Sequence, residues 1–141
     1  MAGKEAQELY CWSMKSDKLF INLASTRKGA AMVGLELGGK ENCLEYFDRL
    51  FPEYQLTVDE GLNRTLIDAV DNALRGKKVP GNLPLDICCT DFQRDAWKTI
   101  AWIPFGQTRT YGEVASMMGR PGGARAVGQA MNRNPLPLIF P

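Results

Sequence analysis

The chain has 141 residues, of which 45% are hydrophobic and 23% charged, and its net charge is +1. These values are typical of one compact domain or two small lobes. No apolar run reaches the roughly 18 residues that cross a membrane, and the polar N-terminus lacks a signal-peptide pattern, so we expect a cytoplasmic protein without a membrane partner. There is no histidine, which excludes Ser-His-Asp and Cys-His catalysis and every histidine-bearing metal site among these residues.

The charges are unevenly distributed along the chain. Residues 1–90 hold 11 Lys/Arg against 13 Asp/Glu, whereas residues 91–141 hold six against three. A positive C-terminal part fits a lobe that binds a polyanion, although an ordinary solvated surface explains the same difference. The four cysteines (Cys11, Cys43, Cys88 and Cys89) show no CxxC spacing, so we interpret them as reduced structural thiols.

The first third of the chain predicts a small antiparallel sheet. Residues 8–14, 18–24 and 31–37 are short apolar-rich runs, and residues of turn-forming types separate them. Residues 41–51 follow with apolar side chains at helical spacing, and Pro52 ends this predicted helix.

A second helix is predicted after a capping-box pattern formed by Thr57 and Glu60, and Gly76 marks its end. The stretch from there to Pro84 is polar and rich in Gly and Pro, as in a connection between lobes. We therefore expect an N-terminal lobe of residues 1–84 and a second lobe of residues 85–141.

The second lobe begins with a predicted short strand, residues 85–89. Capping-box patterns at Thr90 and Thr110 then open two helices, and a Gly-containing turn leads into a last helix over residues 124–132. The last two helices form a candidate helix-turn-helix, although many helical hairpins share this pattern.

The last predicted helix has two different faces. At 100° per residue its inner face holds small and apolar residues (Ala124, Val127, Gly128 and Met131), and its outer face holds one cation and two amides (Arg125, Gln129 and Asn132). Small residues, Ala126 and Ala130, allow a partner to approach the backbone closely. The outer face therefore fits a DNA groove, and a polar solvated face fits the same pattern equally well.

Residues 134–141 are as apolar as a core strand, which is unusual for a chain end. We interpret them as a strand that enters a core, partly exposed unless later residues cover it. The alternative is a tail that docks on its own domain.

Four stretches resemble the C-terminal lobe of the O6-alkylguanine-DNA alkyltransferases in order and spacing. They are residues 90–93 (TDFQ) with Trp97, 103–115 (IPFGQTRTYGEVA), 124–128 (ARAVG) and 134–141 (NPLPLIFP). The resemblance implies an α/β fold: an N-terminal ribonuclease-H-like lobe with a small antiparallel sheet, and a C-terminal helical lobe with a winged-helix-like helix-turn-helix.

The resemblance also implies roles for individual residues. Tyr111 would crowd the phosphate beside the target nucleotide, and Arg125 would enter the duplex and fill the vacated place. The recognition helix would meet the minor groove through Ala124, Arg125, Ala126 and Gln129. Asn134 would brace the turn before the nucleophile. The alkyl pocket would be lined by Tyr111, Met131, Asn134 and Pro137.

The implied activity is DNA repair by direct reversal, in which an alkyl group moves once from guanine O6 to the protein itself. The partner would be double-stranded DNA containing O6-alkylguanine, bound by a protein that is a monomer when complete. No cofactor and no metal are expected. The target nucleotide must leave the duplex, because a thiolate cannot reach O6 inside the stack.

In this family the acceptor cysteine comes directly after the position of Pro141, so no catalytic residue is expected among residues 1–141 and we expect them to be inactive in transfer. A shortened gene explains this, and so does a UGA codon that encodes selenocysteine. Cys or Sec at the next position indicates transfer, whereas Trp or Ala indicates a non-catalytic module that binds alkylated DNA and flags it for other repair. A transcription-factor-like DNA binder is a third alternative.

Overall fold

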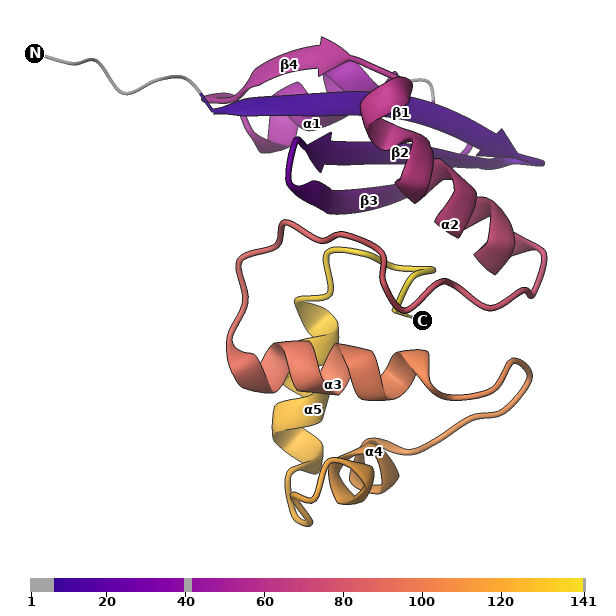
Figure 1. Ribbon diagram of the computed structural model, residues 1–141, viewed down its shortest axis with the longest axis vertical. Coiled ribbons are helices and arrows are strands. Elements are labelled where there is room, and N and C mark those ends of the chain that lie inside the picture. Colours follow the sequence, from indigo (N-terminus) through magenta and orange to yellow (C-terminus); the bar gives the residue numbers. More distant parts are fainter. Residues whose placement is uncertain (1–6, 40–41, 141) are drawn as a thin grey trace, which may run out of the picture.

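A four-stranded sheet forms one layer of the molecule, with order β3-β2-β1-β4 (Figure 1). The computed structural model describes residues 7–39 and 42–140. As predicted, β1 (Glu8–Ser16), β2 (Leu19–Thr26) and β3 (Gly29–Leu37) form an antiparallel meander. However, the sheet has a fourth strand that was not predicted: β4 (Gln55–Val58) pairs in parallel with β1, so the sheet as a whole is mixed. The sequence of β4, QLTV, does alternate polar and apolar residues, but Thr57 was predicted to cap a helix.

Alternating side chains of the strands enter two different cores, because successive residues of a strand point to opposite faces. Ala24 belongs to the core under α1 (Cys43–Leu50), a helix predicted over residues 41–51. Its neighbour Leu23 belongs to the larger core formed with α2 (Arg64–Leu74) and the C-terminal part of the chain. Residue 41 lies outside the described residues. The sheet is therefore covered on both faces.

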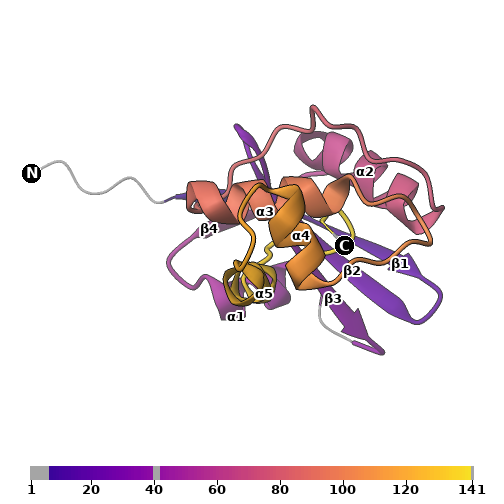
Figure 2. The same cartoon turned by 90° about the horizontal axis from the view of Figure 1, so that it is seen from below.

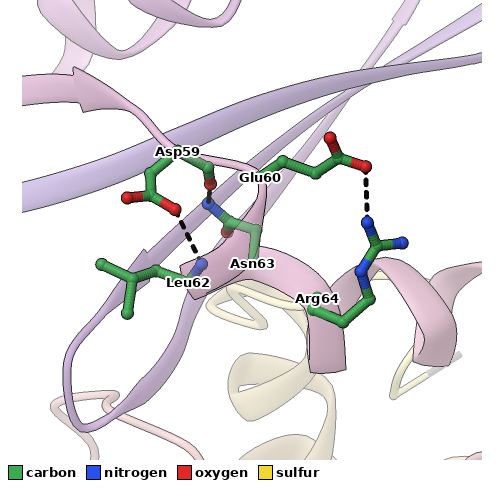
Figure 3. Close-up of polar contacts among 5 residues, drawn as sticks. All are labelled: Asp59, Glu60, Leu62, Asn63 and Arg64. Atoms are coloured by element: carbon green, nitrogen blue, oxygen red, sulfur yellow. Dashed lines mark hydrogen bonds and ion pairs between the residues drawn. The ribbon is translucent and has the colours of Figure 1, made fainter.

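The start of α2 differs from the capping box predicted at Thr57, which instead lies in β4. The side chain of Asp59 accepts the backbone N–H of Leu62 at 2.8 Å, before a short 3-10 turn that leads into the helix (Figure 3). The fully buried Asn63 donates to the carbonyls of Asp59 (2.9 Å) and Tyr10 (3.0 Å). These bonds join the start of α2 to β1. The predicted helix start at Thr57 was wrong because Thr57 pairs with β1 as part of β4.

The strand predicted over residues 85–89 was wrong. Leu85 forms only an isolated bridge with Ala30, whose N–H donates to Pro84 at 2.9 Å and whose carbonyl accepts from Asp86 at 2.8 Å. Gly29 permits this approach, because a Cβ atom there would lie 2.5 Å from the Pro84 carbonyl. The connection thus follows the edge of β3, and the lobe boundary between residues 84 and 85 stays a prediction.

Three helices form the rest of the molecule: α3 (Asp91–Ala101), α4 (Tyr111–Met117) and α5 (Ala124–Asn132). The capping box at Thr90 is present in both directions, and the Thr110 hydroxyl accepts the N–H of Glu113 at 3.1 Å. The turn between α4 and α5 contains Gly119 and Gly122 at positive φ. Seen from below, α4 and α5 lie beside α3 (Figure 2). Among the described residues, no helix has the length and hydrophobicity to span a membrane.

The last described residues lie between the sheet and the helices (Figure 1). The Pro135 carbonyl accepts the N–H of Val33 at 2.8 Å, and Leu136, Ile139 and Phe140 are buried in the larger core. Each such side chain contributes about 1.5–3 kcal/mol of burial energy. Residues 134–140 form turns and bends, so the predicted strand was wrong. Ile139 and Phe140 are buried and Leu138 is half-buried, which agrees with the alternative of a segment that docks on its own domain.

Trp97 joins α3 to α5 and to the end segment. Its ring stacks on Phe140 with centroids 6.0 Å apart, and its Nε1 donates to the Ala130 carbonyl at 2.8 Å. That carbonyl also accepts from Arg133 at 3.2 Å. Trp97 is 1% exposed, so both the hydrogen bond and the packing are shielded from water.

We expect Trp97→Phe to lower the free energy of unfolding by about 1–3 kcal/mol, because a buried hydrogen bond and part of the ring volume are lost. Urea denaturation measures the change. Trp102→Phe is the matched control: Trp102 is 74% exposed, so the free energy of unfolding should change by no more than about 0.5 kcal/mol. Equal losses in the two variants would contradict the role given to Trp97.

Candidate DNA-binding site

The outer face of α5 is exposed, as its sequence pattern predicts. Arg125, Gln129 and Asn132 are exposed, whereas Val127 is fully buried. Ala126 is exposed, in agreement with a backbone open to close approach. Ala130 was misassigned to such a role, because it is 2% exposed beneath Trp97. Ala124, which the sequence pattern placed on the inner face, is half-buried.

A hollow of about 490 Å³ lies between the first turn of α3 and the outer face of α5. The lining holds no acidic residue; it consists of Thr90, Phe92, Gln93, Ala126, Gln129, Ala130, Asn132 and Arg133. The guanidinium of Arg120 lies over the Phe92 ring, 5.4 Å from its centroid. The sequence analysis missed the α3 residues of this hollow; their only sequence signal was the capping box that leaves Thr90 at an exposed helix start.

Three arginines of this part, Arg120, Arg125 and Arg133, are exposed. Within residues 7–39 and 42–140 we find no ion pair that involves any of them. Arg109, by contrast, lies 4.0 Å from Glu113. The end of the molecule around α5 therefore carries positive charge that no neighbouring carboxylate neutralises, which favours an anionic partner.

Tyr111, the first residue of α4, is half exposed, and its ring lies against Gly128 in the middle of α5. Met131 lies one turn farther along α5 and packs against both the larger core and a third core, under α4. This third core consists of Ile100, Val114, Ala115 and Val127. The structure thus places two of the predicted pocket residues along the same side of α5.

Asn134 and Pro137 lie in the turns that follow α5. The Asn134 side chain accepts the N–H of Leu136 at 2.9 Å and donates to the Phe140 carbonyl, which fixes the path of the last described residues. Pro137 is half-buried. Neither residue lines the hollow beside α5, and neither do Tyr111 and Met131.

The four thiols lie outside α4 and α5. Cys11 and Cys43 are buried in the core under α1, whereas Cys88 is exposed and Cys89 half-buried in the connection before α3. Burial and, to a lesser extent, the neighbouring Cys43 together raise the pKa of the Cys11 thiol to about 12. In the described part of the chain, no three His, Cys, Asp or Glu side chains come together as metal ligands.

We expect the thiols to react in order of exposure. With iodoacetamide at pH 8, Cys88 should react fastest and Cys11 only after unfolding, because a buried thiol with a raised pKa stays protonated. An unfolded Cys ionises near pH 8.5, so Cys11 should also lower stability as the pH rises from about 8.5 towards 12. Peptide mass spectrometry measures the order; early modification of Cys11 would contradict the structure.

Residues 91–141 match the model of the DNA-binding domain of 6-O-methylguanine DNA methyltransferases. The methylated-DNA–protein-cysteine methyltransferase of Mycobacterium leprae is 40% identical over 83 residues, which cover 59% of this chain and 50% of that protein. The enzyme of the same name from Methanosarcina barkeri is 35% identical over 111 residues, 74% of this chain and 70% of that protein. The chain thus spans about half the length of several of the relatives that it matches.

The likeness extends to the whole fold. A crystal structure of Mycobacterium tuberculosis OGT in complex with DNA superimposes with a TM-score of 0.67 and 30% identity, covering 95% of this chain and 74% of that one. This match confirms the predicted α/β fold class. A helical part that matches the DNA-binding domain of the methylguanine methyltransferases is therefore joined to a small mixed sheet. The chain belongs to the methylated-DNA–protein-cysteine methyltransferase family.

Proposed function

We propose that this protein repairs DNA by direct reversal, transferring an alkyl group from guanine O6 to an acceptor Cys or Sec of its own. The observation that carries the proposal is the exposed, acid-free face of α5, which lies within the part that matches the family's DNA-binding domain. Residues 1–141 would supply DNA binding and base extrusion, and the acceptor would follow Pro141.

In this proposal α5 enters the minor groove. Ala124 and Ala126 are small enough to let the sugar-phosphate walls approach the helix, and Gln129 can donate to groove acceptors. Arg125 enters the stack and takes the place of the extruded nucleotide. Its guanidinium is planar and can stack on neighbouring bases, and no described carboxylate pairs with it.

Tyr111 would press on the backbone beside the target nucleotide, and its exposure of 50% leaves it accessible for this contact. Met131 and Pro137 would form apolar walls for the alkyl group together with Tyr111. Asn134 would hold the turn that leads to the acceptor, because its side chain bonds to the backbone on both sides of that turn.

The chemistry needs an acidic thiol or selenol at the extruded base. Its anion attacks the alkyl carbon, the bond from that carbon to O6 breaks, and guanine takes up a proton. Extrusion costs a few kcal/mol, which inserted Arg125 and crowding by Tyr111 would offset in part. None of the four cysteines lies on α4, on α5 or in the turns after α5.

Arg125→Ala should weaken binding to duplex DNA by about 1–3 kcal/mol and abolish the preference for O6-methylguanine, because the vacated stack is no longer filled. Fluorescence anisotropy with lesion and unmodified duplexes at several salt concentrations measures both effects. Arg75→Ala is the matched control, since Arg75 pairs with Asp71 at the end of α2.

An even loss on both duplexes, with a salt slope reduced by about one, would make Arg125 a phosphate contact instead. Unchanged binding of the Arg125→Ala variant would indicate that the outer face of α5 is an ordinary solvated surface.

Transfer of the alkyl group can be followed directly with a labelled substrate. A polypeptide of residues 1–141, incubated with duplex DNA carrying a labelled O6-methyl group, should bind the lesion without becoming labelled. Stoichiometric label on any of the four cysteines, located by peptide mapping, would overturn the placement of the acceptor after Pro141.

The alternative function is binding without transfer, in which the protein flags alkylated DNA for other repair. The absence of a thiol from α4 and α5 is equally compatible with this alternative. The residue encoded after Pro141 discriminates the two: Cys or Sec supports transfer, and Trp or Ala supports binding alone.

A further inference from the structure

Gly128 stands in the middle of α5, where glycine is the least suitable residue apart from proline. It has no positive φ, so the backbone does not require glycine there. Glycine in a helix interior is less favourable than alanine, because the unfolded chain loses more freedom. The reason for Gly128 must therefore be steric.

The steric reason is a single side chain. A Cβ atom at residue 128 would lie 3.1 Å from Cε2 and 3.2 Å from Cδ2 of Tyr111. Apart from the backbone of α5 and the chain neighbours Val127 and Gln129, no other described heavy atom lies within 4 Å of that position. The edge of the Tyr111 ring thus occupies the space that any other residue would fill.

The backbone of Tyr111 is itself fixed, so the ring cannot retreat by moving the helix. Thr110 caps α4 through the N–H of Glu113, at 3.1 Å. Val114 and Ala115 are buried against α5, which anchors the same helix on its inner side. A side chain at residue 128 would therefore push the Tyr111 ring outward from α5, by rotation about the side-chain torsions of Tyr111.

We propose that Gly128 is a positioning residue that sets where the Tyr111 ring stands relative to DNA. This inference rests on the proposed function, in which Tyr111 presses on the backbone beside the target nucleotide. A shift of a few tenths of an ångström matters because the ring must meet the phosphate backbone while α5 lies in the groove. Gly128 thus favours correct placement of Tyr111 at the expense of helix stability.

The test is a double-mutant cycle on the 141-residue chain with Gly128→Ala, Tyr111→Ala and the double variant. Each binds a duplex with 2-aminopurine next to O6-methylguanine, and the rise in fluorescence reports extrusion of the neighbouring base. Gly128→Ala should lower the equilibrium constant for extrusion roughly fivefold relative to the parent chain. In the Tyr111→Ala background the same substitution should leave that constant unchanged.

Thermal melting supplies the readout that a purely structural role would change. The Tm of Gly128→Ala should be no lower than that of the parent chain, because alanine favours the helix. Gly112→Ala is the matched control: its Cβ would meet only Thr110 Oγ1, at 3.8 Å, so extrusion should be unchanged. If crowding unfolds the single variant, the double variant should refold, because the ring that causes the crowding is absent.

The outcomes separate the two claims. Normal extrusion by Gly128→Ala, with a defect in Tyr111→Ala, would overturn only the positioning role. An equal loss on Gly128→Ala in both backgrounds would also overturn it, since residue 128 would then act on DNA directly. No defect in Tyr111→Ala would overturn the role of Tyr111 in the proposed function and the positioning role with it.

Discussion

The arrangement of the sheet relative to the helices α3, α4 and α5 depends on the packing of Trp97. One indole bonds to the end of α5 through the Ala130 carbonyl and stacks on Phe140 in the segment that follows. Leu136 and Ile139 are buried beside it against the sheet. The orientation of α5 is therefore fixed by a continuous core, because close-packed interiors transmit small shifts rather than absorbing them. In the proposed function α5 enters a DNA groove, and a helix in that role needs such a rigid base.

In the proposed function the short helix α5 has two partners, the protein core and the DNA. Its inner residue Val127 belongs to the core with α3 and α4, whereas Arg125 and Gln129 face outward. Tertiary packing of the inner face supplies the stability that a nine-residue helix lacks alone. The outer face can therefore be selected for contact rather than for helix propensity. The uncompensated charge of Arg125 is consistent with this division, since it contributes little to folding.

Local signals made the helices of the C-terminal part predictable. The capping box at Thr90 and the bounds of α5 follow from side chains a few residues apart. Such local interactions do not depend on how distant parts of the chain pack. The parallel pairing of β4 and the path of residues 85–89 along β3 depend on partners distant in sequence. The turns of residues 134–140 were read as a strand because Asn134, which shapes them, acts through side-chain bonds that hydrophobicity does not reveal.

The same reasoning applies to the site. The exposed face with Arg125 was predictable from helical periodicity, but the hollow formed with Thr90 was not, because α3 and α5 meet only in the folded chain. Gly128 was placed on the inner side from its position alone, and only the structure identifies the ring of Tyr111 as its neighbour. Sequence patterns thus indicate which face of a helix is used. The spacing between two side chains that act together has to be read from the packing of the helices that carry them.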